Sequence, residues 1–161
     1  MADLQVGDSV LAAPGVYSKV YMFSHRLEET KTAFVALETA AGAQLLLTPD
    51  HYLHVNGSLA AAHTVQVGHH VTLADGTRSA VTAVRKQWAA GLYNPHTLHG
   101  DIVVDGVQTS TYTQGIAPAL AHAALWPVRM LYAAGVQTSE ATFAHGSELL
   151  AQLLPNGQEK Y

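Results

Sequence analysis

Three two-residue turn signals divide the first two thirds of this chain and constrain its fold most strongly. Asn-Gly and Asp-Gly pairs favour type I′ hairpins, because both central residues of that turn need positive φ. The segments around them are rich in valine, threonine, leucine and tyrosine, as strands are. The chain is therefore predicted to be all-β, with short strands joined by hairpins. The three pairs are Asn56-Gly57, Asp75-Gly76 and Asp105-Gly106.

The last third of the chain predicts helices instead. Residues 117–132 are rich in alanine and leucine, and Pro127 predicts a break between a short helix and a second helical turn or helix. Residues 139–154 have the pattern of an amphipathic helix with Ser139 as its N-cap. No linker-like stretch separates these segments, so composition alone marks no domain boundary.

A weak internal echo suggests a duplication. Residues 4–12 resemble residues 65–73 at an offset of 61, and each copy precedes an apolar strand after a turn. A V-x-V-G corner is also an ordinary way to begin a strand. The echo therefore supports two copies of a β unit without proving them.

The composition excludes several classes of protein. The 161 residues contain no cysteine, which excludes disulfides, thiolate metal sites and a cysteine nucleophile supplied by this chain. The net charge of −4 and the scattered basic residues argue against a nucleic-acid partner. No apolar run approaches the roughly 18 residues of a membrane span. The 10 histidines are the feature that needs a chemical account.

Five sequence blocks occur in an order that is specific although each alone is weak. They are DLQVGDSVLA (3–12), KVYMFSHR (19–26), LLLTPDHYLHV (45–55), GDIVVDGVQTSTYT (100–113) and LAHAALWPVRMLY (120–132). In these blocks the chain resembles a Hint domain, and more narrowly the hedgehog autoprocessing type. The resemblance implies an all-β, horseshoe-like fold with internal pseudo-twofold symmetry. It implies a Hint domain over residues 1–135, followed by a helical tail over residues 136–161.

The resemblance assigns a chemistry to two of the site residues. In such domains a cysteine attacks the carbonyl of the residue before it, and a second nucleophile then releases the upstream polypeptide from the thioester. Thr48 and His51 match the family's T-x-x-H motif. The resemblance implies that His51 is the acid near the leaving amine and that Thr48 holds the scissile amide. Pro49 fixes φ after Thr48, so one tight bend can aim both side chains at one point.

His25 is the third catalytic candidate. It stands where hedgehog proteins carry the aspartate assigned to activation of the sterol hydroxyl. A neutral imidazole is a competent general base near pH 7, so the acceptor stays open between water, a small alcohol and a sterol. Thr111 stands where hedgehog proteins have a second cysteine, and we expect it to be an ordinary strand residue.

The main departure from the family concerns the nucleophile. Family members carry it on a strand before the D-L-x-V-G-D block, whereas here Met1 stands immediately before that block. We therefore expect the nucleophile strand to be absent from these residues and the chain alone to be inactive. The implied partners are an upstream polypeptide cleaved in cis and an alcohol or sterol acceptor. The resemblance also implies a parent protein in the secretory pathway.

The alternative function is a non-catalytic binding module. A Hint fold without its first strand would expose unpaired backbone groups, which a complementing N-terminal strand could satisfy by β-augmentation. Intein splicing is disfavoured, because no asparagine here follows a histidine.

Several histidine pairs raise a metal hypothesis. Residues three apart on a strand face opposite sides, so His51 and His54 are not expected to chelate together. His96 and His99 are predicted to lie in a loop, because an Asn-Pro pair and a glycine flank them. We expect no metal and no cofactor. His122 is predicted to be a helix residue packed under the sheet, and the predicted core aromatic residues are Tyr21, Phe23, Phe34, Trp88 and Trp126.

Overall fold

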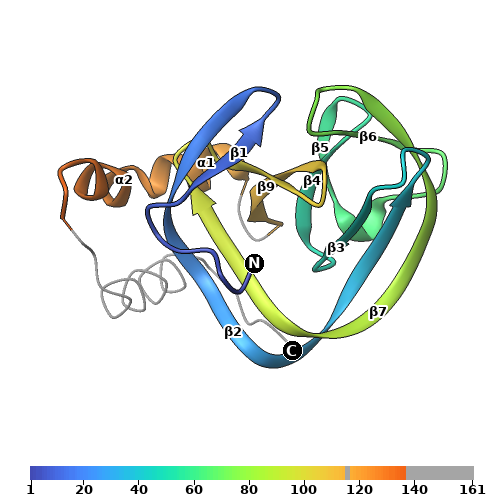
Figure 1. Cartoon of the computed structure of the whole chain (residues 1–161), viewed down its shortest axis with the longest axis horizontal. Coiled ribbons are helices and arrows are strands. Elements are labelled where there is room, and N and C mark those ends of the chain that lie inside the picture. Colours follow the sequence, from blue (N-terminus) through green and yellow to red (C-terminus); the bar gives the residue numbers. More distant parts are fainter. Residues whose placement is uncertain (115–116, 137–161) are drawn as a thin grey trace.

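The computed structural model describes residues 1–114 and 117–136, and they form a horseshoe-like β domain followed by two short helices (Figure 1). All strand pairs are antiparallel, and the main path of the sheet has the order β1-β2-β7-β6-β4-β9-β8, with β3 paired to β2 and β5 paired to β4. The elements are β1 (Ser9–Ala13), β2 (Val16–Thr39), β3 (Gln44–Leu47), β4 (His51–Val55), β5 (Ser58–Ala61), the 3₁₀ turn η1 (Ala62–Thr64), β6 (His70–Thr72), β7 (Arg78–Thr97), β8 (Asp101–Val104), β9 (Val107–Thr113), α1 (Pro118–Ala124) and α2 (Trp126–Ala133). The all-β prediction is confirmed.

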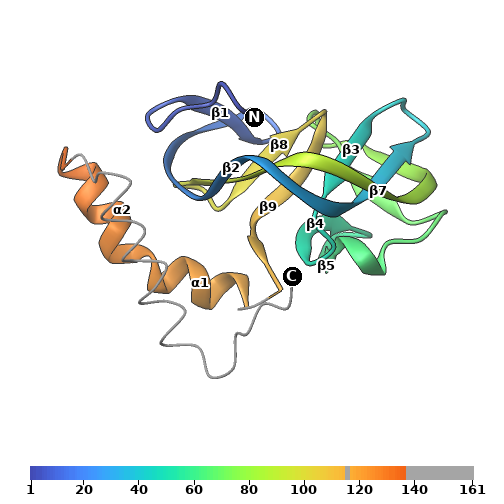
Figure 2. The same ribbon diagram turned by 90° about the horizontal axis from the view of Figure 1, so that it is seen from below.

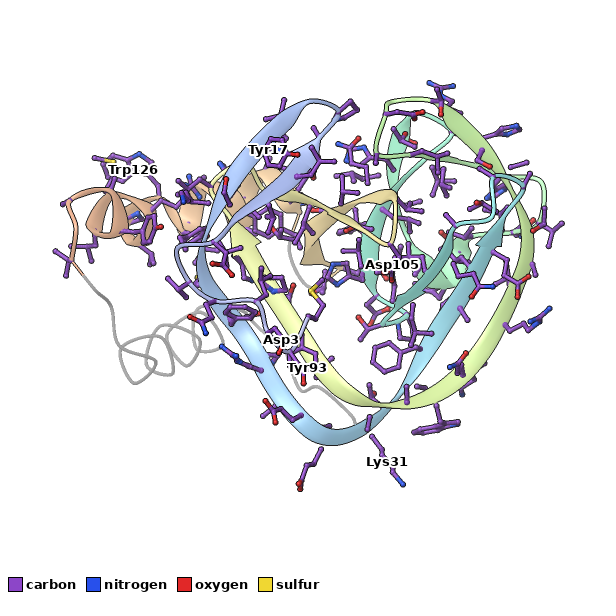
Figure 3. All side chains as sticks on the ribbon, viewed as in Figure 1. Asp3, Tyr17, Lys31, Tyr93, Asp105 and Trp126 are labelled. Atoms are coloured by element: carbon purple, nitrogen blue, oxygen red, sulfur yellow. The ribbon has the colours of Figure 1, made fainter. Side chains whose placement is uncertain are left out.

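Two of the strands are much longer than the predicted short strands. β2 has 24 residues and β7 has 20, and they pair from Val20 opposite Thr97 to Thr39 opposite Val81. The ribbon bends where the register shifts between Leu27 and Lys31. In Figure 3 the Lys31 side chain points outward from this bend. The prediction of short strands was wrong here, because an irregular stretch of polar residues bends the ribbon without interrupting it.

The predicted internal echo is a repeated backbone corner. Gly7 and Gly68 both have φ near +90°, a conformation that favours glycine. At each corner the glycine N–H donates to a carbonyl 13 residues later, and that later residue donates back. The two sets, offset by 61, are Gly7 N to Val20 O (2.8 Å) with Val20 N to Asp8 O (2.9 Å), and Gly68 N to Val81 O (2.9 Å) with Val81 N to His69 O (2.7 Å).

Two of the three turn signals form the predicted hairpins. Asn56 and Gly57 both have positive φ between β4 and β5, and Asp105 and Gly106 do so between β8 and β9. At the third signal only Gly76 has positive φ. There the Asp75 carboxylate accepts hydrogen bonds from the backbone N–H and hydroxyl of the residue two positions later, which makes a different turn.

Two hydrophobic clusters occupy the two parts of the horseshoe. The first lies among β2 to β7 and includes the buried residues Leu37, Leu45, Leu47, Leu53, Val55, Val71 and Val81. The second lies where β2, β9 and α1 meet, and it consists of Tyr21, Met22, Tyr112, Ala121 and Leu125. This second cluster attaches the helices to the sheet next to the residues discussed below.

Two of the predicted core aromatic residues are exposed instead. Tyr21 and Phe34 are buried as expected, and Phe23 is half-buried, but Trp88 is 68% exposed and Trp126 is 58% exposed. Trp88 lies near the bend of the β2–β7 ribbon, where Lys86 Nζ sits 5.8 Å from its ring centroid. Trp126 projects from α2 (Figure 3). An indole needs a covering layer to be buried, and neither position has one among the described residues.

The helices α1 and α2 follow the predicted pattern, with the break at Leu125 just before Pro127. Figure 2 shows them running along one side of the strands and extending beyond them. No helix within the described parts of the chain has the length and apolarity needed to cross a membrane. The helix predicted over residues 139–154 lies outside the described residues.

We expect Leu53→Ala to lower the free energy of unfolding by about 2–5 kcal/mol, because Leu53 is fully buried and its truncation leaves a cavity. Trp88→Ser should change it by less than about 0.5 kcal/mol, because that side chain is mostly solvated. Urea unfolding followed by circular dichroism measures both. Equal losses from the two variants would contradict this assignment of the core.

Candidate active site

The predicted T-x-x-H motif forms a tight turn between β3 and β4. The His51 backbone N–H donates to the Thr48 carbonyl at 3.1 Å. Neighbouring segments hold the middle of the turn: the His63 N–H donates to Pro49 O, and the Gln114 N–H donates to Asp50 O, both at 2.8 Å. The half-buried side chains of Thr48 and His51 therefore flank one fixed bend.

The His51 ring has one nitrogen engaged and one left for a reacting group. Its Nε2–H donates to the Ser110 carbonyl of β9 at 2.8 Å, which fixes the tautomer of the neutral ring with a lone pair on Nδ1. Burial lowers the pKa of His51 below its ordinary value, and the Ser110 hydrogen bond opposes that shift. The ring is thus neutral near pH 7 and able to take up and return one proton.

His25 lies on β2 at a bulge. Phe23 is opposite Pro95 and His25 is opposite Asn94, so two residues of β2 span one step of β7. Pro95 has no N–H for a ladder hydrogen bond, which fits this local irregularity. Ser24 is the extra residue, and its hydroxyl turns toward side chains of β7.

The structure adds His96, which the sequence interpretation placed in a loop. That prediction was wrong: Asn94 to Thr97 belong to β7 and are buried. The Asn-Pro pair lies at the bulge of a strand pair and does not start a turn. Burial, with smaller contributions from positive charge on His51 and His25, lowers the pKa of His96 to about 3. His25 and His51 thus lie close enough to His96 for their charges to act on it.

A buried polar network surrounds His96. Asn94 Nδ2 donates to Ser24 Oγ at 2.9 Å, and Ser24 Oγ lies 3.2 Å from His96 Nε2. Among the described residues, three buried side-chain polar atoms have no hydrogen-bond partner: Tyr21 OH, Asn94 Oδ1 and His96 Nδ1. The Tyr21 and His96 rings are neighbours, with centroids 6.3 Å apart. Burial, together with the neighbouring Tyr112 phenol, raises the Tyr21 pKa against the opposing effect of Arg129, so this phenol stays protonated.

Thr111 is a strand residue, as predicted. It is fully buried in β9, and its Oγ1 donates to the Gly100 carbonyl at 3.0 Å. His122 has a partner from the same strand: its Nδ1 and the Tyr112 hydroxyl are 2.7 Å apart. These contacts tie β9, which also carries the Ser110 carbonyl bonded to His51, to Gly100 and to α1.

His51 and His54 have different partners, as strand periodicity predicts. His54 Nε2 lies 2.9 Å from Asp101 Oδ2, which also accepts a hydrogen bond from Gln108 at 3.0 Å. Within residues 1–114 and 117–136, no group of three or more histidine or acidic side chains is arranged to hold a metal ion. The position of His54 is thus explained by its contact with Asp101, which Gln108 also holds.

Comparison with known proteins gives a consistent result. The family model of the Hint module matches residues 1–155. Indian hedgehog B protein of Danio rerio is 35% identical over 153 residues, covering 81% of this chain and 37% of that protein. Warthog protein 1 of Caenorhabditis elegans is 31% identical over 134 residues, covering 76% of this chain and 28% of that protein. This chain thus spans about a third of these two relatives.

Solved structures share the fold at low sequence identity. The gp41-1 intein superposes with a TM-score of 0.61 at 13% identity, covering 68% of this chain and 84% of that one. A bacterial intein-like domain from Clostridium thermocellum gives 0.57 at 20% identity, covering 67% and 84%. The β architecture that carries His51 and His96 is therefore one that inteins also adopt.

Proposed function

This chain belongs to the Hint family, and from that premise we propose that it is the acid–base part of a hedgehog-type autoprocessing site. The reaction is cleavage of an upstream polypeptide through a thioester. One observation supports this above the others: a T-x-x-H turn holds a neutral His51 whose Nε2 is bonded to β9, which leaves Nδ1 for chemistry.

The proposed first step moves one proton through His51. A cysteine thiol passes its proton to Nδ1, and its sulfur attacks the carbonyl carbon of the preceding residue. The C–S bond forms as the carbonyl electron pair moves to oxygen. When that pair returns, the C–N bond breaks and the imidazolium gives its proton to the departing nitrogen. The products are a thioester and a free amine, and His51 is neutral again.

Thr48 and His25 have separate proposed roles. Thr48, which closes the turn with His51, hydrogen-bonds the scissile amide. His25 removes a proton from the acceptor that attacks the thioester, which is water, a small alcohol or a sterol. Its place on β2 opposite Asn94 puts it near His96 and on a different strand from His51. A base for the second step on a separate strand would leave His51 free to act in the first.

The thiol must come from outside these residues, because the sequence contains no cysteine. We propose that a cysteine-bearing strand joined ahead of residue 1 supplies it, and that residues 1–161 alone do not cleave. The site described here would then supply the proton transfers and the backbone frame but not the nucleophile.

A reporter fusion tests the proposed function. The reporter is joined through a cysteine-bearing strand to the start of the chain, and dithiothreitol is added as the acceptor thiol. We expect thiol-dependent release of the reporter, and no release from a matched fusion with alanine in place of the cysteine. A folded fusion that releases nothing would refute the proposal. Tight binding of the strand as a separate peptide would then favour the binding module.

A further inference from the structure

His96 and His51 share one wall of the site. His51 bonds the Ser110 carbonyl of β9, and the His96 ring lies against Tyr112 two residues later, with centroids 5.6 Å apart. The two imidazoles come from β4 and β7, and His51 and His96 are 45 positions apart in the sequence. Only the fold brings them together at the same short segment of β9.

The polar network around His96 fits one tautomer of its ring. Ser24 Oγ accepts a hydrogen from the Asn94 amide, and its own hydrogen can point to His96 Nε2. In that arrangement Nε2 carries the lone pair, and the hydrogen of the neutral ring is on Nδ1. The Nδ1–H is the atom that is buried without a partner. In this tautomer His96 is a hydrogen-bond donor whose Nδ1–H has no acceptor among the described residues.

A buried donor without an acceptor lowers the stability of the folded protein, and a role during the reaction is one reason for a protein to keep such a donor. Acyl transfer offers such a use, because negative charge develops on the carbonyl oxygen as the nucleophile adds. A donor that is already oriented and shielded from water stabilises that charge without reorganisation. An imidazole that donates this hydrogen bond is best kept neutral when a second imidazole nearby has to carry the proton, because two positive rings would repel each other.

We propose that His96 is a further catalytic residue, whose Nδ1–H donates a hydrogen bond to the carbonyl oxygen of the scissile peptide as it becomes an oxyanion. This inference rests on the proposed autoprocessing function. His96 neither gains nor loses a proton in the step. The electron pair that the thiol sulfur pushes onto the oxygen is held by Nδ1–H, and it returns when the C–N bond breaks and His51 protonates the nitrogen.

The groups around His96 favour a neutral donor at His96 and a proton carrier at His51. The facing groups are His51 from β4, His25 from β2, and the phenols of Tyr21 and Tyr112, both of which stay protonated. Burial keeps His96 neutral, so a positive charge can form on His51 without a second imidazolium beside it. The two imidazoles therefore have different proposed roles: His51 transfers a proton, and His96 donates a hydrogen bond without titrating.

Substitutions in the reporter fusion test the inference. His96→Leu fills the buried space without a donor and should lower the release rate by about 10²- to 10³-fold. His96→Asn places an amide N–H near the former Nδ1 and should release at least about tenfold faster than His96→Leu. His99→Leu, at an exposed position on the same segment, is the matched control and should release at the wild-type rate. If His96→Leu fails to fold, as measured by thermal unfolding, Ser24→Ala tests the same network. It removes the hydroxyl next to Nε2, so the His96 ring is no longer held as the Nδ1–H tautomer and release should slow.

Two further readouts separate catalysis from structure. The pH profile of release should keep its shape in His96→Leu, because a neutral donor does not titrate in the working range; loss of one limb would overturn the assignment. ¹⁵N NMR of histidine-labelled protein should show His96 as the Nδ1–H tautomer at pH 7, and an Nε2–H tautomer would overturn it without any activity measurement. If the wild-type fusion releases nothing, the proposed function has failed. If it releases normally and His96→Leu matches it, only the role of His96 has failed.

Discussion

Replacing His51 with alanine in the reporter fusion should lower thiol-dependent release by about 10²- to 10⁴-fold, the range that a positioned acid–base group supplies. The imidazole takes the thiol proton and returns it to the leaving nitrogen, and water would have to do both in its absence. The ring is held for that task by a single hydrogen bond to the Ser110 carbonyl. Release measured by gel electrophoresis over time gives the rate.

The matched control for this variant is His54→Ala. His54 lies on the same strand, three residues away, and pairs with Asp101, which keeps its hydrogen bond from Gln108. We expect His54→Ala to release at close to the wild-type rate, even if its unfolding midpoint falls slightly. Equal rates for wild type and His51→Ala in folded fusions would remove His51 from the mechanism.

Acid should destabilise this protein well before its carboxylates are protonated. His96 has a folded-state pKa of about 3, against 6.5 for an unperturbed histidine. Between these values the unfolded chain binds a proton that the folded chain refuses, so the free energy of unfolding falls as the pH falls below 6.5. From pH 7.5 to pH 5.0 the loss from His96 alone should be about 2 kcal/mol. The lowered pKa values of His51 and His122 act in the same direction.

Urea unfolding at a series of pH values measures this slope. His96→Leu removes the group and should flatten the dependence by about one proton between pH 6 and pH 4. His69→Leu, which removes a histidine near the surface, is the comparison and should leave most of the slope intact. A slope that is the same in wild type and His96→Leu would show that His96 is not protonated on unfolding.

The parts of the fold that were predictable are those fixed by local chemistry. Asn56-Gly57 and Asp105-Gly106 impose positive φ on their own residues, and the break at Pro127 follows from a missing N–H. The β2–β7 ribbon depends on pairing between residues about 40 to 80 positions apart, which no local pattern records. Trp88 is exposed, contrary to the prediction, for a related reason: its burial depends on whether another layer covers the bend.

The same distinction between local and long-range determinants applies to the candidate site. Thr48 and His51 are joined by one turn, and the motif alone brings them together. His96 depends on Ser24, 72 residues away, and on the Tyr112 ring of a third strand. The Asn-Pro pair before it indicated a turn, and only the bulge opposite Ser24 shows why a strand continues through the proline. The family resemblance pointed to the T-x-x-H motif and not to His96.

The crossing of β2 and β7 between the two parts of the horseshoe has a thermodynamic consequence. The early part of β2 pairs with the late part of β7, while the late part of β2 pairs with the early part of β7 and contributes Leu37 to the first hydrophobic cluster. Each part of the horseshoe therefore contains a strand segment from the other repeat, β2 from the first and β7 from the second. The subunits of a domain-swapped dimer exchange segments in the same way, but here the exchange is within one covalent chain. Neither repeat retains a complete sheet by itself. The two should unfold together in a single cooperative transition that does not depend on protein concentration.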